Sequence, residues 1–344
     1  MRPLVANISR SALQHNFKQF APDSWAVVKA DAYGLGSLEV ARSLPNAAGF
    51  AVACLEEAIV LREGGIAQPI LLLEGVFEPS EWMEVGAYQL DAVVHRPDQL
   101  DGIFSMRERK WAGIWLKIDT GMHRLGMTQQ EGLACKERIS ALSLERRVWM
   151  AHFAEADNLA QQLPVTQAPA GYALSLNNSA AGLARHELPR SWTRAGIALY
   201  GASSVQGQTA QDLNLRCVQQ LQSRVAAIRE VPRGDAVGYG GRWVARRDSR
   251  IATLPGGYAD GYMRSMPDGT RIAFGEVTAP LAGRVSMDRI TVDVTDLPQI
   301  EVGSVAELWG PNVSIDYVAD QAGTIAYELF CNLAPRVPRI WSDA

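Results

Sequence analysis

"GFAVACLEEAIVLREGG", residues 49–65, contains the structural unit from which the fold of this chain can be inferred. Its opening run is apolar throughout, as is typical of a strand that is buried on both faces of a parallel sheet. Leu55, Ala58 and Ile59 then recur at the spacing of one helix face, and Gly64–Gly65 indicates where that helix ends. The stretch therefore predicts a strand followed directly by a helix.

The same unit repeats through the first 200 residues. The apolar runs are WAVVKA (25–30), GFAVAC (49–54), PILLLEG (69–75), LDAVVH (90–95), AGIWLKID (112–119), RVWMAHF (147–153), YALSLN (172–177) and TRAGIALYG (193–201). Most precede a segment of helical spacing, such as residues 128–139, where Thr128 and Glu131 form a capping-box pattern. Eight such units predict a (β/α)8 barrel. The alternative is a doubly wound open sheet, but residues 33–37 offer only a G-x-G where a full G-x-G-x-x-G is typical.

The pattern changes after residue 215. Short β-branched runs alternate there with Gly, Pro and Asp turns, which predicts an all-β domain. Residues 314–341 then predict one or two short helices and a final strand. We therefore expect an α/β barrel over residues 8–220 and a mainly β domain over 221–344 that also includes residues 1–7.

Composition excludes several functional classes. The chain has 344 residues, 47% of them hydrophobic, and a net charge of −4, as is typical of a globular protein without a basic surface for nucleic acid. The cysteines are Cys54, Cys135, Cys217 and Cys331, and none forms a C-x-x-C pair, so we expect no zinc site and no disulfide framework. No signal peptide or 18-residue apolar run is present. We expect a cytoplasmic protein that binds no membrane.

Polar residues stand where the apolar runs end. They are Lys29 with Tyr33, Lys117, Arg124, His152, Ser179, and Arg194 with Gly196 and Ile197. Each has an ordinary structural explanation, such as a solvated lysine or a helix cap, but a barrel brings strand ends together at one mouth. Backbone N–H groups at Gly196–Ile197 would bind a phosphate at a helix start. A phosphate site beside a strand-end lysine suggests pyridoxal phosphate held as a Schiff base, although a sugar-phosphate enzyme also fits.

"AVVKADAYGLG", residues 26–36, resembles the cofactor-attachment segment of the alanine racemases. Further segments resemble that family in the same order: LKIDTGMHRLG (116–126), HFAEAD (152–157), NNSAAG (177–182), TRAGIALYG (193–201), VGYGGRW (237–243), GGYADGY (256–262), GRVSMD (283–288) and PRVPRIW (335–341). The resemblance implies an N-terminal α/β barrel, a C-terminal β domain, pyridoxal phosphate as cofactor and alanine as substrate. It also implies a head-to-tail homodimer whose active sites take residues from both subunits.

The resemblance assigns residue roles as well. Lys29 would be the base for the D-alanine proton, and Tyr239, from the partner subunit, the base for the L-alanine proton on the opposite face. The cofactor would be bound by Lys29, Tyr33, Arg124, His152, Ser179, Arg194, Gly196, Ile197 and Tyr327, with no metal. Arg194 would face the pyridine nitrogen, and because arginine can only donate a hydrogen bond, that nitrogen would stay unprotonated.

Further roles concern the substrate. Arg124 and the backbone of Met287 would bind its carboxylate, and Tyr258 would narrow the entrance. Lys117 matches a lysine that is often carbamylated in the family. Asp31 and Leu35 replace the family's Asn and His, and residues 158–176 are shorter than expected, which predicts a truncated or irregular helix there.

Two alternatives to alanine racemisation stay open. One is another fold-type-III pyridoxal enzyme, such as a broad-specificity racemase or an amino-acid decarboxylase. The other is a non-catalytic pyridoxal-phosphate carrier, although such carriers usually lack a β domain like that of residues 215–344. The sequence is equally compatible with supplying D-alanine as a peptidoglycan precursor and with degrading L-alanine.

Overall fold

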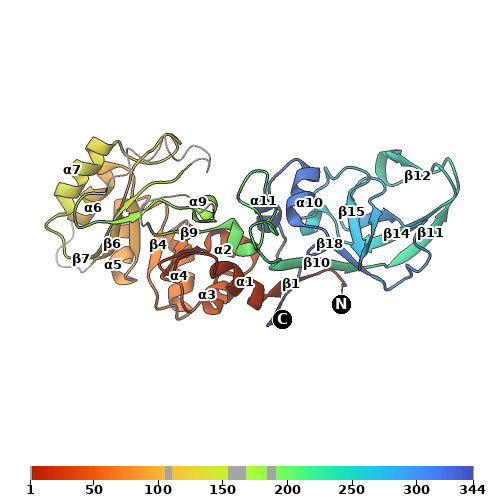
Figure 1. Cartoon of the computed structure of the whole chain (residues 1–344), viewed down its shortest axis with the longest axis horizontal. Helices are drawn as coiled ribbons and strands as arrows, with labels where there is room; N and C mark the ends of the chain where they lie inside the picture. The colour runs from red at the N-terminus through yellow and green to blue at the C-terminus, as the bar shows by residue number, and fades with distance from the viewer. Residues whose placement is uncertain (1, 105–110, 154–167, 184–190, 344) are drawn as a thin grey trace. The chain divides into compact units, whose positions relative to one another are not determined.

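The computed structural model describes residues 2–104, 111–153, 168–183 and 191–343. These residues form two compact units, and Figure 1 labels many of their helices and strands. The barrel unit contains residues 14–199 and 204–208, and the C-terminal unit contains residues 1–13, 200–203 and 209–344.

The barrel unit is built on an eight-stranded parallel sheet in the order β8-β7-β6-β5-β4-β3-β2-β9. Its strands are β2 (Trp25–Val27), β3 (Gly49–Val52), β4 (Ile70–Leu72), β5 (Asp91–Val94), β6 (Trp111–Lys117), β7 (Leu144–Met150), β8 (Ala173–Ser175) and β9 (Arg194–Ala195). Each strand lies within or overlaps one of the predicted apolar runs. A parallel bridge between Asn177 and Thr193 joins the two ends of the sheet. The prediction of a (β/α)8 barrel is therefore confirmed, and the open-sheet alternative was wrong.

Helices follow most of the strands. They are α2 (Lys29–Gly34), α3 (Ser37–Ser43), α4 (Leu55–Glu63), α5 (Trp82–Ala87), α6 (Asp101–Phe104), α7 (Gln129–Ile139) and α9 (Ser179–Leu183), with 3₁₀ turns at η1 (Pro79–Glu81), η2 (Pro97–Leu100) and η5 (Ile197–Tyr200). The predicted capping box of α7 is present, because Glu131 N–H donates to Thr128 Oγ1 and the Glu131 carboxylate accepts from Thr128 N–H. The irregular helix expected within 158–176 falls mostly outside the described residues.

An ion pair between Asp91 and Arg146 lies next to a pair of tryptophan rings in the barrel unit. Trp25 and Trp115 meet edge to face with ring centroids 4.8 Å apart. Trp115 Nε1 donates to Asp91 at 2.8 Å, and Arg146 binds the same carboxylate at 2.9 Å. Asp91 and Arg146 belong to the early residues of β5 and β7, away from the strand ends where chemistry is expected, so this pair serves stability.

The C-terminal unit is mainly β, as predicted. Its six-stranded sheet has the order β16-β15-β18-β10-β1-β19, from β16 (Val277–Pro280), β15 (Arg271–Phe274), β18 (Val305–Trp309), β10 (Gln219–Arg224), β1 (Val5–Ser9) and β19 (Arg339–Ser342). A second sheet joins β11 (Ala227–Val231), β14 (Ser249–Pro255) and β17 (Arg289–Asp293), and β12 (Ala236–Val237) pairs with β13 (Trp243–Val244). Its α-helices are α10 (Ile315–Ala322) and α11 (Ala326–Cys331), and α1 (Arg10–Phe17) spans the boundary between the two units. Within the described ranges, no helix has the length and apolar character needed to cross a bilayer.

Candidate active site

The barrel strands deliver nine of the predicted site residues to one mouth. Lys29 and Tyr33 follow β2, Lys117 ends β6, Arg124 lies in the next loop, His152 follows β7, Ser179 follows β8, Arg194 opens β9, and Gly196 and Ile197 follow it. Because all eight strands are parallel, their carboxyl ends meet at the same end of the barrel.

The backbone after Lys29 is left-handed. Ala30, Asp31, Ala32 and Tyr33 have φ values between 53° and 55°. A non-glycine residue in this conformation costs roughly 1–2 kcal/mol, so the turn persists only because its surroundings hold it. The turn buries the ring of Tyr33, which is 5% exposed, at the barrel mouth.

Three groups converge on a small cradle beside Tyr33. Gly196 N–H donates to Ser179 Oγ at 2.7 Å. A Cβ placed on Gly196 would lie 3.1 Å from Tyr33 Oη and 3.5 Å from Ser179 Oγ. The absence of a side chain at Gly196 therefore keeps two hydroxyls and the start of η5 (Ile197–Tyr200) accessible to one ligand group. Hydroxyls and helix-start N–H groups suit a phosphate.

Arg194 is buried, and none of the carboxylates that the structure describes forms an ion pair with it. Its guanidinium donates to Ser175 O at 2.9 Å, to Ser175 Oγ at 2.5 Å and to Ala151 O at 2.8 Å. These bonds use Nη1 and Nη2, and no acceptor within the described residues is recorded for Nε. Burial lowers the pKa of Arg194 to about 10, so the group stays cationic at neutral pH.

His152 is neutral at the barrel mouth. Burial, and then the positive charges of Arg194 and Lys117, lower the pKa of His152 to about 3. Arg194 Nη2 lies 3.4 Å from His152 Nδ1. Since the guanidinium can only donate, Nδ1 accepts and the proton of the neutral ring is on Nε2.

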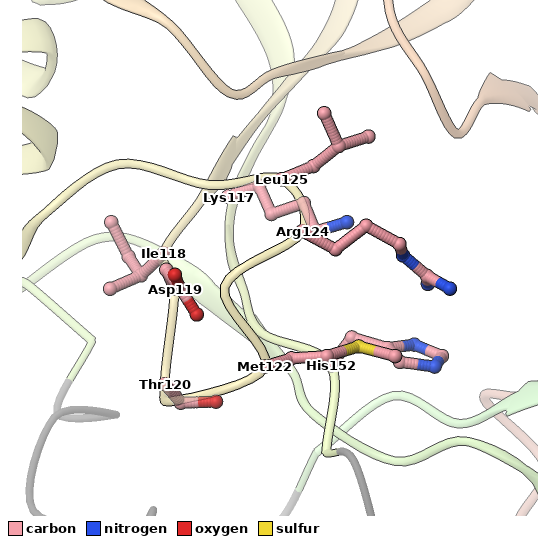
Figure 2. Close-up of a pocket in the computed structure, with 8 residues that line it drawn as sticks. All are labelled: Lys117, Ile118, Asp119, Thr120, Met122, Arg124, Leu125 and His152. Atoms are coloured by element: carbon pink, nitrogen blue, oxygen red, sulfur yellow. The ribbon is translucent and has the colours of Figure 1, made fainter.

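Lys117 and Arg124 are positioned by the loop after β6. Asp119 accepts from Gly121 N–H at 3.0 Å and from His123 N–H at 3.1 Å, which folds the loop that carries Arg124. Figure 2 shows the side chains of Arg124 and His152 extending toward the same region, with the Lys117 amine near the stem of Arg124. Burial, with the charges of Arg194 and Arg124, lowers the pKa of Lys117 to about 8.

The mouth therefore concentrates positive charge. Within the described part of the chain, no ion pair joins Lys29, Lys117, Arg124 or Arg194 to a carboxylate. Buried charges are normally paired in proteins. The arrangement suits an anionic ligand.

The other predicted residues belong to the C-terminal unit, where their side chains are partly or largely exposed. Tyr239 is 71% exposed, Met287 53%, Tyr258 40% and Tyr327 38%. Single exposed side chains of this kind are common on protein surfaces, so their arrangement relative to one another is more informative than their exposure.

Three motif segments of this unit are joined to one another. Tyr258 N–H donates to Ser286 O at 3.1 Å, which connects the segments that carry Tyr258 and Met287. Arg242 donates to Gly283 O at 3.2 Å, which connects the segment that carries Tyr239 to the segment that carries Met287. The structure thus brings three residues that are distant in sequence onto adjoining segments.

Comparisons with known proteins agree with this geometry. The family model for the alanine racemase N-terminal domain matches residues 8–204, and the model for the C-terminal domain matches residues 218–341. The chain belongs to the alanine racemase family. This membership confirms the resemblance drawn from the sequence motifs and places the chain in a family of isomerases.

Individual alanine racemases are similar over nearly the full length. The alanine racemase of Stutzerimonas stutzeri is 44% identical, with 98% of this chain and 99% of that protein covered. A catabolic alanine racemase of Pseudomonas aeruginosa is also 44% identical, with 100% of both chains covered. The crystal structure of a biosynthetic alanine racemase from Pseudomonas aeruginosa is 42% identical with a TM-score of 0.94, covering 99% of this chain and 100% of that one.

The sequence analysis assigned no role to two residues at this barrel mouth. Ser175 accepts from Arg194, and its position inside the apolar run YALSLN was the available signal. Asp31, for which the sequence offered no role, accepts from Ser37 N–H at 2.7 Å, the first amide of α3. Asp31 therefore caps a helix start, which an Asn oxygen would do equally well.

Proposed function

We propose that the protein interconverts L-alanine and D-alanine with pyridoxal phosphate. The observation that carries this proposal is the buried Arg194 beside the neutral His152, at the same barrel mouth as Lys29. An arginine there donates to a ring nitrogen without protonating it, which suits proton transfer at the α-carbon rather than chemistry that needs a protonated ring.

The residues present fit the cofactor. Tyr33, Ser179 and the backbone of Gly196 and Ile197 would hold the phosphate, whose negative charge would compensate the cations of the mouth. The family resemblance assigns Tyr327 to the same phosphate. Arg194 would donate a hydrogen bond to the pyridine nitrogen, and Arg124 would bind the phenolic oxygen. Lys29 is the amine to which the cofactor attaches.

When bound, the cofactor withdraws electrons from the α-carbon of alanine and acidifies its proton. Lys29 holds and moves this proton on the D-alanine face, and the Tyr239 oxygen does so on the L-alanine face. As a base, the Tyr239 oxygen must carry negative charge, which a hydrogen-bond donor and a nearby cation stabilise. His152 Nε2–H donates to that oxygen, and Arg194 polarises the imidazole from its other side. Arg124 and the backbone of Met287 orient the substrate carboxylate.

We further propose a homodimer in which Tyr239 and Met287 serve the partner subunit's barrel and Tyr258 narrows the entrance. The exposure of these three side chains and the hydrogen bonds between their segments support this proposal. Lys117 is the candidate for carbamylation, since its lowered pKa provides the neutral amine that reacts with carbon dioxide. The resulting anion would pair with Arg124.

The decisive experiment follows racemisation and α-proton exchange in deuterated water. Tyr239→Phe should reduce racemisation at least about a hundredfold, because it removes one of two general bases. D-alanine should still exchange its α-proton through Lys29, whereas L-alanine should not. Tyr88→Phe, which changes a tyrosine before the amino end of β5, is the control. Unreduced racemisation in Tyr239→Phe, or faster turnover of lysine or serine than of alanine, would contradict the proposal.

Mixing two inactive variants tests the shared site. Lys29→Ala combined with Tyr239→Phe should recover about one quarter of wild-type activity, because half of the dimers are mixed and each has one intact site. No recovery after subunit exchange would show that each site draws both bases from one chain.

A further inference from the structure

Glu57 connects the carboxyl ends of two barrel strands. Its Oε1 accepts from Ala30 N–H at 2.7 Å, and its Oε2 accepts from Ala53 N–H at 2.7 Å. Ala53 directly follows β3 (Gly49–Val52), and Ala30 directly follows Lys29. One carboxylate thus holds the backbone on both sides of the gap between β2 and β3.

The sheet itself does not fix the direction of Lys29. The backbone contact from Val28 N–H to Ala51 O, at 2.8 Å, is where the pairing of β2 with β3 ends, one residue before Lys29. The chain then enters the left-handed turn of Ala30 to Tyr33. Glu57 continues the link between the strands past the last sheet contact, and it binds the first amide of that turn.

The far end of the turn has its own anchor. Asp31 O accepts from Gly36 N–H at 2.9 Å, and the Asp31 carboxylate accepts from Ser37 N–H. The turn is therefore held by carboxylates from two directions: Glu57 at its beginning and Asp31 toward α3. Among the residues that the structure describes, Glu57 is the hydrogen-bond partner of the Ala30 amide, which directly follows Lys29.

We propose that Glu57 is a positioning residue for Lys29. It locks the left-handed turn so that the Lys29 amine leaves the strand toward the cradle formed by Tyr33, Ser179 and Gly196. This inference rests on the proposed role of Lys29 in racemisation. Glu57 acts through the backbone of Ala30 and takes no proton from the substrate.

A simple helix cap is the competing explanation. Glu57 is the third residue of α4, and an acid in the first turn of a helix interacts favourably with its amino end wherever it points. Glu56 occupies the same first turn and is exposed. Glu56→Gln therefore removes the same charge from the helix start while leaving the Ala30 contact intact, which makes it the matched control for Glu57→Gln.

The first measurement is amide hydrogen exchange over residues 26–37 in the cofactor-loaded protein. Glu57→Gln keeps the side-chain volume but presents an amide N–H₂ group to one of the two N–H donors. Because the substitution also removes the negative charge, the hydrogen bond from Ala30 N–H is weakened in one orientation of the amide and lost in the other. The Ala30 amide should therefore exchange faster, by up to about a hundredfold. Glu56→Gln should leave this exchange unchanged.

The second measurement is chemical. Borohydride reduction followed by mass spectrometry measures how fast the cofactor is fixed onto Lys29, and Glu57→Gln should slow this at equal cofactor occupancy. In steady-state racemisation, kcat should fall about tenfold or more while KM for alanine changes less than about twofold, because a displaced Lys29 affects the reacting geometry while Arg124 stays on its own loop.

Some results would overturn the proposal. Faster exchange at Ala30 with unchanged reduction at Lys29 and unchanged kcat would show that Glu57 only caps α4. An equal loss in Glu56→Gln would show that only the charge at the helix start matters. If the wild-type protein did not racemise alanine, the proposed function would fail, but exchange and Lys29 reduction would still decide the role of Glu57.

Discussion

Gly196→Ala tests whether the cradle at the barrel mouth binds a phosphate. The added Cβ would lie 3.1 Å from Tyr33 Oη, which is closer than ordinary van der Waals contact, and 3.5 Å from Ser179 Oγ. Gly196 has no positive φ, so alanine fits the backbone without strain. The substitution therefore narrows the space beside the Gly196 amide and requires Tyr33 Oη to shift by a few tenths of an ångström.

The magnitude follows from the bonds that the methyl group blocks. A hydrogen bond to a charged group contributes about 1.5–3 kcal/mol, which corresponds to roughly a 10- to 150-fold rise in Kd for each bond lost. Absorbance titration of the cofactor-free protein with pyridoxal phosphate measures this rise. Pyridoxal, which lacks the phosphate, should bind the variant and the wild-type protein equally. Equal weakening of both ligands, or an unchanged Kd for pyridoxal phosphate, would refute the assignment of the cradle.

Two further predictions concern protonation at the mouth. With the pKa of Lys117 lowered to about 8, roughly a tenth of its amine is neutral at pH 7 and about half at pH 8. Addition of ¹³C-bicarbonate should therefore give a carbamate NMR signal that rises over this pH range and is absent in Lys117→Arg. A signal that persists in Lys117→Arg would contradict the assignment. His152, with its pKa lowered to about 3, should show no imidazole titration by NMR between pH 5 and 9. The unfolded chain takes up this proton near pH 6.5, so the free energy of unfolding should fall as the pH drops from 6.5 toward 3. A His152 titration midpoint near 6 would contradict this prediction.

The sequence pattern predicted the barrel because a strand that is buried on both faces has an uninterrupted run of apolar residues. The strand β6 (Trp111–Lys117) is buried at all seven positions, and its sequence is apolar up to Lys117. Strand ends were equally visible, since a polar residue that follows such a run must lie at the sheet edge. Lys29, Lys117 and His152 were found in this way, and the barrel placed them together.

The left-handed turn was not predictable in the same way. Ala30, Asp31, Ala32 and Tyr33 have no intrinsic preference for positive φ, and only Gly34 and Gly36 suggest an unusual turn. The conformation depends on partners that are distant in sequence, such as Glu57. A pattern of residue types contains no record of such a contact. The Arg194–Ser175 contact was hidden for the same reason.

The charge distribution explains why these hidden contacts matter. Arg194 is 3% exposed, and its recorded partners are neutral oxygens and the neutral His152. Replacing an anionic partner by neutral acceptors leaves part of the desolvation penalty uncompensated. A protein that kept a carboxylate there would be more stable without its cofactor, but that carboxylate would compete for the cations and would favour a protonated ring nitrogen. On the proposed function, the phosphate of the cofactor and the carboxylate of the substrate would supply the negative charge that these cations lack within the described residues, and relief of the desolvation penalty would contribute to ligand binding.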